Sequence, residues 1–147
     1  MQKDYLNKYK YDNYTKEETY NLVKYHDMVT DADEVLIKKR LNRFGKERFL
    51  NLIKVQRADN LAQNPSYDRT NHLNVLEEMT ERILQESCFS LSSLAINGSD
   101  LINAGFERGA KIGKILKALL EEVIENRLPN EKEDLLKRAY KLNENLL

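Results

Sequence analysis

The stretch from Leu94 to Leu120 constrains the fold more than any other part of the chain. It contains four of the five glycines, and they divide it into a short segment, a loop and a long amphipathic segment. In the long segment the apolar residues recur with the period of an α-helix: Ile112, Ile115, Leu116, Leu119, Leu120, Val123 and Ile124. We therefore predict two helices, at about 99–104 and from 110 onward, joined by a turn over 105–109.

The remaining composition favours helix throughout. Hydrophobic residues make up 41% of the 147 positions, prolines number only two, and Leu, Lys, Glu and Asn dominate. A chain of this length can bury a substantial core. We predict an all-α fold of about seven helices, in which a helical body is followed by a subdomain resembling a helix-hairpin-helix.

Start and stop signals place the other helices. Thr15 to Glu18 has capping-box spacing for a helix that ends near His26, and Gly45 ends a second helix that begins at Asp31 or Asp33. Further helices are predicted at 46–63 and 70–87. Asn130, with Glu133 three residues later, is expected to cap a terminal helix. Residues 89–94 read as a connector or a strand-like joint, so we predict a body over 1–88 and a C-terminal subdomain over 89–147.

Charge and cysteine content limit the classes of partner. Twenty-four basic residues balance twenty-four acidic ones, so binding to a polyanion must come from local patches. A single cysteine fits a reducing cytoplasm, and no segment is apolar enough to predict a membrane span. Six tyrosines precede Asp27, and an exposed patch there is compatible with a homodimer.

Two basic surfaces are candidates for contact with nucleic acid. In the glycine-rich stretch, backbone N–H groups at the start of the long helix can bind a phosphate and nearby cations supply charge; the candidates are Arg108, Gly109, Lys111, Gly113, Lys114 and Lys117. A helical wheel places the three lysines opposite the apolar residues. The second surface is the basic run from Lys38 to Arg57, represented by Lys39 and Arg43. Alternatively, the glycines only permit tight helix packing and the lysines only face solvent.

The sequence offers no catalytic residues that we would assign. Neither a nucleophile motif of the form Gly-x-Ser-x-Gly nor a nucleotide-phosphate loop is present. Asp31 and Asp33 have the spacing of a magnesium-binding pair, but they precede a helix, where carboxylates serve as caps. His26, Asp27 and Asp59 are candidate metal ligands of the kind found in helical phosphohydrolases, although the whole chain has only two histidines.

The order of these segments resembles the C-terminal part of bacterial CCA-adding tRNA nucleotidyltransferases of the poly(A) polymerase family, including the end of their HD-type helical domain. The segments that carry the resemblance are Lys10–Asn13, Leu22–Asp27, Ala58–Asp59, Leu94–Leu101, Gly109–Leu116 and Leu119–Val123, with Asn130. Ala110 stands where members of that family often have proline.

The resemblance implies a role in gripping tRNA. In that family an N-terminal head carries the catalytic carboxylates, and helical body and tail regions hold the tRNA. No counterpart of the head is found here, so the resemblance implies that this chain itself needs no cofactor, that Mg²⁺ is bound by the head, and that the head belongs to the same polypeptide. Two alternatives remain open: a remnant of an HD-type metal-dependent phosphohydrolase, and a non-catalytic helical module that reads duplex DNA.

Overall fold

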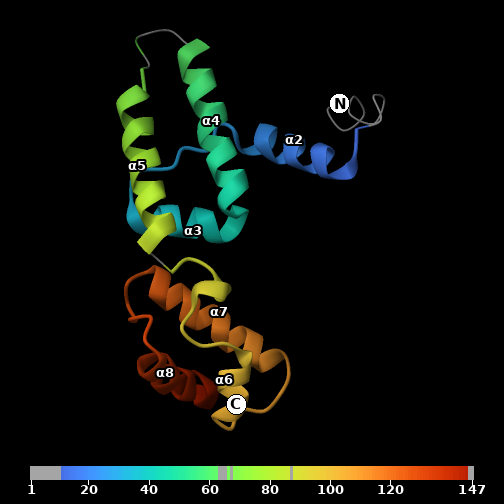
Figure 1. The fold of residues 1–147 in the computed structure, drawn as a ribbon, viewed down its shortest axis with the longest axis vertical. Helices are drawn as coiled ribbons and strands as arrows, with labels where there is room; N and C mark the ends of the chain where they lie inside the picture. The colour runs from blue at the N-terminus through green and yellow to red at the C-terminus, as the bar shows by residue number, and fades with distance from the viewer. Residues whose placement is uncertain (1–10, 63–65, 67, 87, 146–147) are drawn as a thin grey trace.

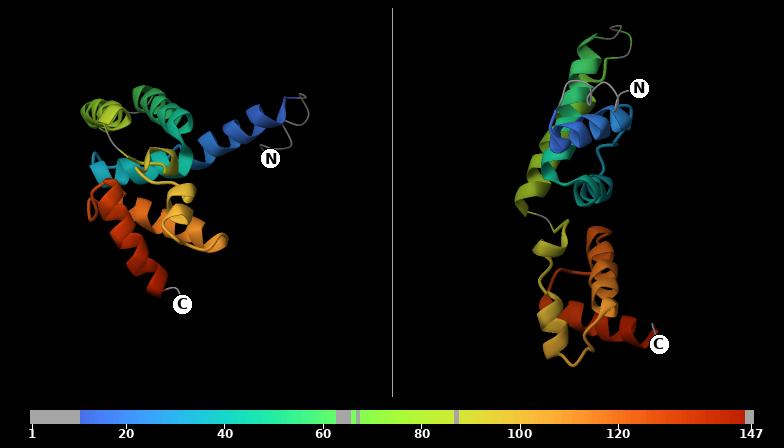
Figure 2. Two further views of the ribbon diagram at one scale, coloured as in Figure 1. Left: turned by 60° about the horizontal axis from the view of Figure 1, so that its bottom comes forward. Right: turned by 90° about the vertical axis from the view of Figure 1, so that its right-hand side faces the viewer.

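The computed structural model describes residues 11–62, 66, 68–86 and 88–145, and within these ranges the chain is all-α, as predicted. Seven α-helices and one short 3-10 helix follow one another without a strand in the described residues: α2 (Asn13–Tyr25), α3 (Glu34–Phe44), α4 (Lys46–Ala62), α5 (Thr70–Glu86), η2 (Leu91–Ser93), α6 (Gly98–Asn103), α7 (Ala110–Ile124) and α8 (Lys132–Asn145). In Figure 1 the helices α2 to α5 form one group and α6 to α8 form another, and the side view in Figure 2 shows the same division.

Local signals set most of the helix ends. The Asp33 carboxylate accepts a hydrogen bond from the backbone N–H of Leu36 at 2.8 Å, which makes Asp33 the N-cap of α3. Gly45 ends α3 with a φ of 78°, a conformation that favours glycine. The start of α2 differs from the prediction. Asp12 rather than Thr15 is its N-cap, because the Asp12 carboxylate accepts hydrogen bonds from both the N–H and the hydroxyl of Thr15.

The first group of helices surrounds what we call the N-terminal cluster. Its buried side chains come from α3, α4 and α5: Ile37, Leu41, Phe44, Phe49, Leu52, Ile53, Leu76 and Ile83. Helix α2 buries no residue fully and packs mainly on α4. Arg48 of α4 fastens it there, since its guanidinium pairs with the Glu18 carboxylate through both Nε, at 2.9 Å, and Nη2. Helix α2 is therefore held by this ion pair and by the partly buried Leu22 and Tyr25, which pack against the N-terminal cluster.

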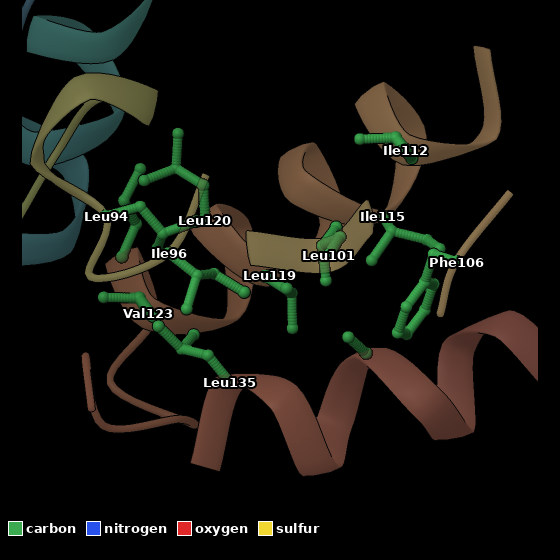
Figure 3. Packing of buried hydrophobic residues seen from close by; sticks show 12 residues of the cluster. Leu94, Ile96, Leu101, Phe106, Ile112, Ile115, Leu119, Leu120, Val123 and Leu135 are labelled. Atoms are coloured by element: carbon green, nitrogen blue, oxygen red, sulfur yellow. The ribbon is translucent and has the colours of Figure 1, made fainter. Parts of the chain in front are cut away.

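The second group surrounds the C-terminal cluster, shown in Figure 3. Residues at the predicted apolar positions of α7 point into it. The rest come from the segment around η2, from α6, from the turn between α6 and α7, and from α8: Leu94, Ile96, Leu101, Phe106, Leu135 and Ala139. The joint at 89–94 contains a 3-10 turn and no strand. Arg138 of α8 contacts the Glu122 carboxylate of α7 through Nε and Nη2 at 2.6 to 3.0 Å, which fixes the two helices side by side.

Asn130 has a different role from the one predicted. It does not cap α8; its side-chain oxygen accepts a hydrogen bond from the Ala95 N–H at 2.8 Å, and its side-chain nitrogen donates to the Ser93 carbonyl at 2.9 Å. One side-chain amide thus both accepts from a backbone N–H and donates to a backbone carbonyl of another segment, as the backbone of a neighbouring strand would. Asn130 therefore joins the turn before α8 to the segment between η2 and α6.

Helices α3 and α7 connect the two clusters. Lys39 pairs with Glu125 at the C-terminal end of α7 at 2.6 Å, and the largely buried Lys38 pairs with Glu34 at 2.5 Å and approaches the side-chain oxygen of Asn126 at 3.4 Å. The hydrogen bond from Lys39, followed by that from Arg127, holds the pKa of Glu125 below its usual value. Polar contacts thus make up much of the junction. The domain boundary predicted at residue 88 stays a prediction.

Across the described segments, no helix is both long and apolar enough to cross a membrane.

Candidate nucleic-acid interface

The turn between α6 and α7 depends on two glycines. Gly105 has a φ of 93° and Gly109 a φ of 148°, and both values lie in the region that L side chains rarely adopt. Gly109 is the N-cap of α7, and no side chain accepts a hydrogen bond from the first turn of that helix. The Ile112 N–H bonds to the Gly109 carbonyl at 3.2 Å, and the N–H groups that precede it, at the positive end of α7, are available to an external acceptor.

Three cations lie on the exposed side of this helix start. Arg108, Lys114 and Lys117 are all exposed, and in the described part of the chain none of their side chains makes an ion pair or a hydrogen bond. Gly113 lies one turn before Lys117 on α7, and a Cβ built at Gly113 would meet nothing within 4 Å. We call the set of Arg108, Gly109, Gly113, Lys114 and Lys117 the α7 face.

Lys111 does not lie on the exposed face of α7, where the sequence placed it with Lys114 and Lys117. Its side chain is partly buried and its ammonium donates a hydrogen bond to the backbone carbonyl of Asn143 at 3.0 Å. Asn143 belongs to the last turn of α8, where carbonyl groups lack partners within the helix. Lys111 therefore caps α8 from outside, a role that the helical wheel could not reveal because the wheel does not include α8.

One residue of the second predicted basic surface, Lys39, lies next to the α7 face. Lys39 of α3 and Lys117 of α7 line the same hollow, together with Asn42, Leu91, Leu120, Glu121 and Ile124. The two lysines differ in availability, since Lys39 is paired with Glu125 whereas Lys117 is not paired within the described residues. We therefore keep Lys117 as a candidate for binding a phosphate. Lys39 serves mainly in the contact between α3 and α7.

Arg43 lies in a separate place, at the corner where α2 meets the end of α3. Its guanidinium carbon is 5.5 Å from the ring centre of Tyr25 and 5.1 Å from that of Phe44. Lys24 approaches the same Tyr25 ring, with its ammonium nitrogen 5.2 Å from the ring centre. Sequence reasoning did not single out Lys24, because only the packing of α2 against the other helices of the first group brings Lys24 near Arg43.

The candidate metal ligands do come close to one another, but they do not form a metal site. His26, Asp27 and Asp59 line one small cavity with Gln56, Asn60 and Arg69. The His26 Nδ1 lies 2.6 Å from the Val23 carbonyl, so it donates there, and its Nε2 lies 3.0 Å from the Asp27 carboxylate. Among the residues that the structure describes, no three His, Cys, Asp or Glu side chains are arranged to hold a metal ion. A phosphohydrolase centre at these residues gains no support.

Comparison with known families decides the relationship. Residues 2–139 match the tRNA nucleotidyltransferase domain 2 family. The chain belongs to this family. A curated relative, the CCA-adding enzyme of Limosilactobacillus fermentum (strain NBRC 3956 / LMG 18251), is 47% identical over 49 residues, which cover 33% of this chain and 12% of that enzyme. The resemblance to the C-terminal region of CCA-adding tRNA nucleotidyltransferases is thereby confirmed.

The matched part is small compared with the enzyme. Because the aligned region spans only 12% of the relative's length, that enzyme's activity does not transfer to this chain by similarity alone. No solved structure gave a significant match. Membership of the family assigns the chain to a tRNA-processing group of proteins, and the contacts described above must carry any more specific function.

Proposed function

We propose that this chain is the tRNA-binding helical portion of a CCA-adding tRNA nucleotidyltransferase, and that the catalytic head is a separate part of the protein outside these 147 residues. The α7 face is the observation that carries the proposal. It combines an uncapped helix start and an exposed glycine of α7 with three cations that are unpaired in the described structure, two on α7 and Arg108 in the turn before it. These features suit a phosphate backbone, and the family supplies tRNA as the RNA.

Each feature has a physical use in such a complex. Arginine and lysine side chains attract phosphate by their positive charge, and backbone N–H groups at a helix start donate directional hydrogen bonds to it. Gly113 places no side chain between the helix backbone and a partner, so a phosphate or ribose can approach α7 closely. The contacts that result position an RNA without reading its bases. Recognition by shape is what a protein needs when it must accept many tRNAs of different sequence.

Two carboxylates near helix starts, Asp33 and Asp100, have structural roles. Asp33 caps α3, and Asp100 accepts hydrogen bonds from the Asn97 N–H at 2.9 Å and from Lys132 at 2.6 Å. The hydrogen bond from Lys132, followed by that from Asn97, lowers the pKa of Asp100. With no metal-binding cluster among the described residues, we propose that Mg²⁺ is held by carboxylates of the head. The residues here bind and orient the RNA.

Replacement of Gly113 by alanine separates this proposal from a purely structural account. Alanine has the higher helix propensity and meets no neighbour at this position, so Gly113→Ala is expected to raise the free energy of unfolding by about 0.5–1 kcal/mol. If the RNA backbone approaches α7 here, the same change weakens tRNA binding by about 1 kcal/mol, roughly fivefold. Urea unfolding and a tRNA titration by fluorescence anisotropy measure the two effects.

Asn71→Ala provides the matched control, because Asn71 is also an exposed helical residue but lies on α5. It should leave tRNA affinity unchanged. A Gly113→Ala chain that is more stable and binds tRNA as tightly as wild type would refute the close approach of RNA to α7.

A further inference from the structure

A second cluster of cations lies far from the α7 face along the chain. Lys24 of α2 and Arg43 of α3 share the ring of Tyr25, at 5.2 and 5.5 Å from its centre. The Arg43 Nη2 is also 3.5 Å from the Tyr25 hydroxyl, and the Tyr25 and Phe44 rings meet edge to face with centres 5.0 Å apart. Two like charges thus lie within 5.5 Å of the centre of one aromatic ring. We call Lys24, Tyr25 and Arg43 the corner cluster.

Among the residues that the structure describes, no carboxylate neutralises the corner cluster. Within the described residues neither Lys24 nor Arg43 forms an ion pair, and both side chains are exposed. The acids of α2 are committed elsewhere: Glu18 pairs with Arg48, and Glu17 lies 3.8 Å from the same guanidinium. Asp27 follows Lys24 by three residues but contacts His26 at 3.0 Å. Two unpaired cations that repel each other leave a local positive potential that a multivalent anion would relieve.

Aromatic side chains extend the cluster along α2. Lys24 is also 5.7 Å from the ring centre of Tyr20, one helical turn earlier. Tyr14 lies further along the same helix and is 64% exposed. Alternation of cations with exposed aromatic rings is typical of surfaces that bind RNA, since cations contact phosphates and rings stack on unpaired bases or pack against ribose.

We propose that the corner cluster is a second RNA-backbone site, in which Lys24 and Arg43 bind phosphodiester oxygens of the same tRNA that the α7 face binds. This inference rests on the proposed function. Arginine suits the role because its planar guanidinium can donate two hydrogen bonds to one phosphate while it stays stacked on an aromatic ring. Lys24 adds a second positive charge from α2, whereas Arg43 belongs to α3. The RNA would then contact both groups of helices shown in Figure 1.

The experiment compares tRNA binding of three double variants over a series of salt concentrations. The test variant is Lys24→Gln with Arg43→Gln, and the control is Arg82→Gln with Lys141→Gln, which removes two exposed cations without partners in the described residues. The third, Lys114→Gln with Lys117→Gln, probes the α7 face. We expect the test variant to bind transcribed tRNA about tenfold more weakly than the control, with a salt slope lower by about one to two.

Two further variants guard against an effect on folding. Lys24→Gln alone removes an exposed charge and should weaken binding about threefold, about half of the double variant's free-energy loss. Arg43→Lys keeps the charge over the rings and should retain more affinity than Arg43→Gln. If the corner variants bind like the control while the α7 variant binds weakly, this inference is overturned and the proposed function stands. If only the corner variants lose affinity, RNA binding by Lys24 and Arg43 stands, whereas the α7 face and the binding of one tRNA by both sites are overturned. A wild-type chain that does not bind tRNA overturns both.

Discussion

The variant that combines Arg108→Glu, Lys114→Glu and Lys117→Glu is expected to bind tRNA at least about 100-fold more weakly than the wild-type chain at low salt. Three phosphate contacts are lost and three repulsive charges replace them. With three fewer phosphate contacts, binding releases fewer counterions. The slope of log affinity against log salt concentration should therefore become shallower by about three. Titrations of fluorescent tRNA at four or five salt concentrations measure both quantities.

The stability of this variant is part of the prediction. Arg108, Lys114 and Lys117 have no ion pair or hydrogen bond to lose among the described residues, so the unfolding free energy should change by about 0.5 kcal/mol or less. A control with the same change in net charge is Arg82→Glu, Lys137→Glu and Lys141→Glu, all at exposed positions outside the α7 face and the corner cluster. Equal loss of affinity in the two variants would show that net charge, and not the α7 face, governs binding.

Leu119→Ala should have the largest effect on stability. Leu119 is 0% exposed and points from α7 into the middle of the C-terminal cluster, as Figure 3 shows. Removal of a buried leucine side chain leaves a cavity and costs about 2–5 kcal/mol. A domain of this size has a total stability of about 5–15 kcal/mol, so we expect a large fall in the urea midpoint and, at physiological temperature, loss of tRNA binding through loss of the folded helix pair.

Leu61→Ala is the comparison for this change. Leu61 belongs to α4 and is 78% exposed, so the same truncation there removes almost no buried surface. Its unfolding transition should match that of the wild-type chain within about 0.5 kcal/mol. A Leu119→Ala chain with wild-type stability would contradict the assignment of α7 as the central helix of the C-terminal cluster.

The helices could be predicted from sequence because local signals determine them. The apolar period of α7, the Asp33 cap and the Gly45 stop each depend on residues within one or two turns, and the structure has all three where the sequence placed them. The 3-10 turn at Leu91–Ser93 was not predicted, since the serines and leucines of residues 90–94 are compatible with several local conformations.

Side chains whose partners are distant in sequence could not be assigned in this way. Asn130 bonds to residues 35 and 37 positions away, and Lys111 to a carbonyl 32 positions away. From the sequence, Asn130 was predicted to cap the terminal helix and Lys111 to be an exposed cation that binds RNA. Lys24 was missed for the same reason, since its relation to Arg43 exists only after α2 packs against the other helices.

The family relationship also depends on the order of segments more than on overall identity. The aligned part of the CCA-adding enzyme covers only a third of this chain, whereas the family match runs over residues 2–139. The family match therefore includes helices of both groups. This agrees with an RNA that contacts α7 in one group and the corner cluster in the other.

Competition between tRNA and duplex DNA tests the central claim most directly. The wild-type chain is bound to fluorescent tRNA near physiological salt, and unlabelled tRNA or a DNA duplex with the same number of phosphates is added. If the chain recognises the shape of tRNA, tRNA should displace the label at a concentration at least about tenfold lower than the duplex, because the two differ in groove shape and in the 2′-hydroxyl groups. Equal competition by the two nucleic acids, or the absence of tRNA binding, would contradict the account.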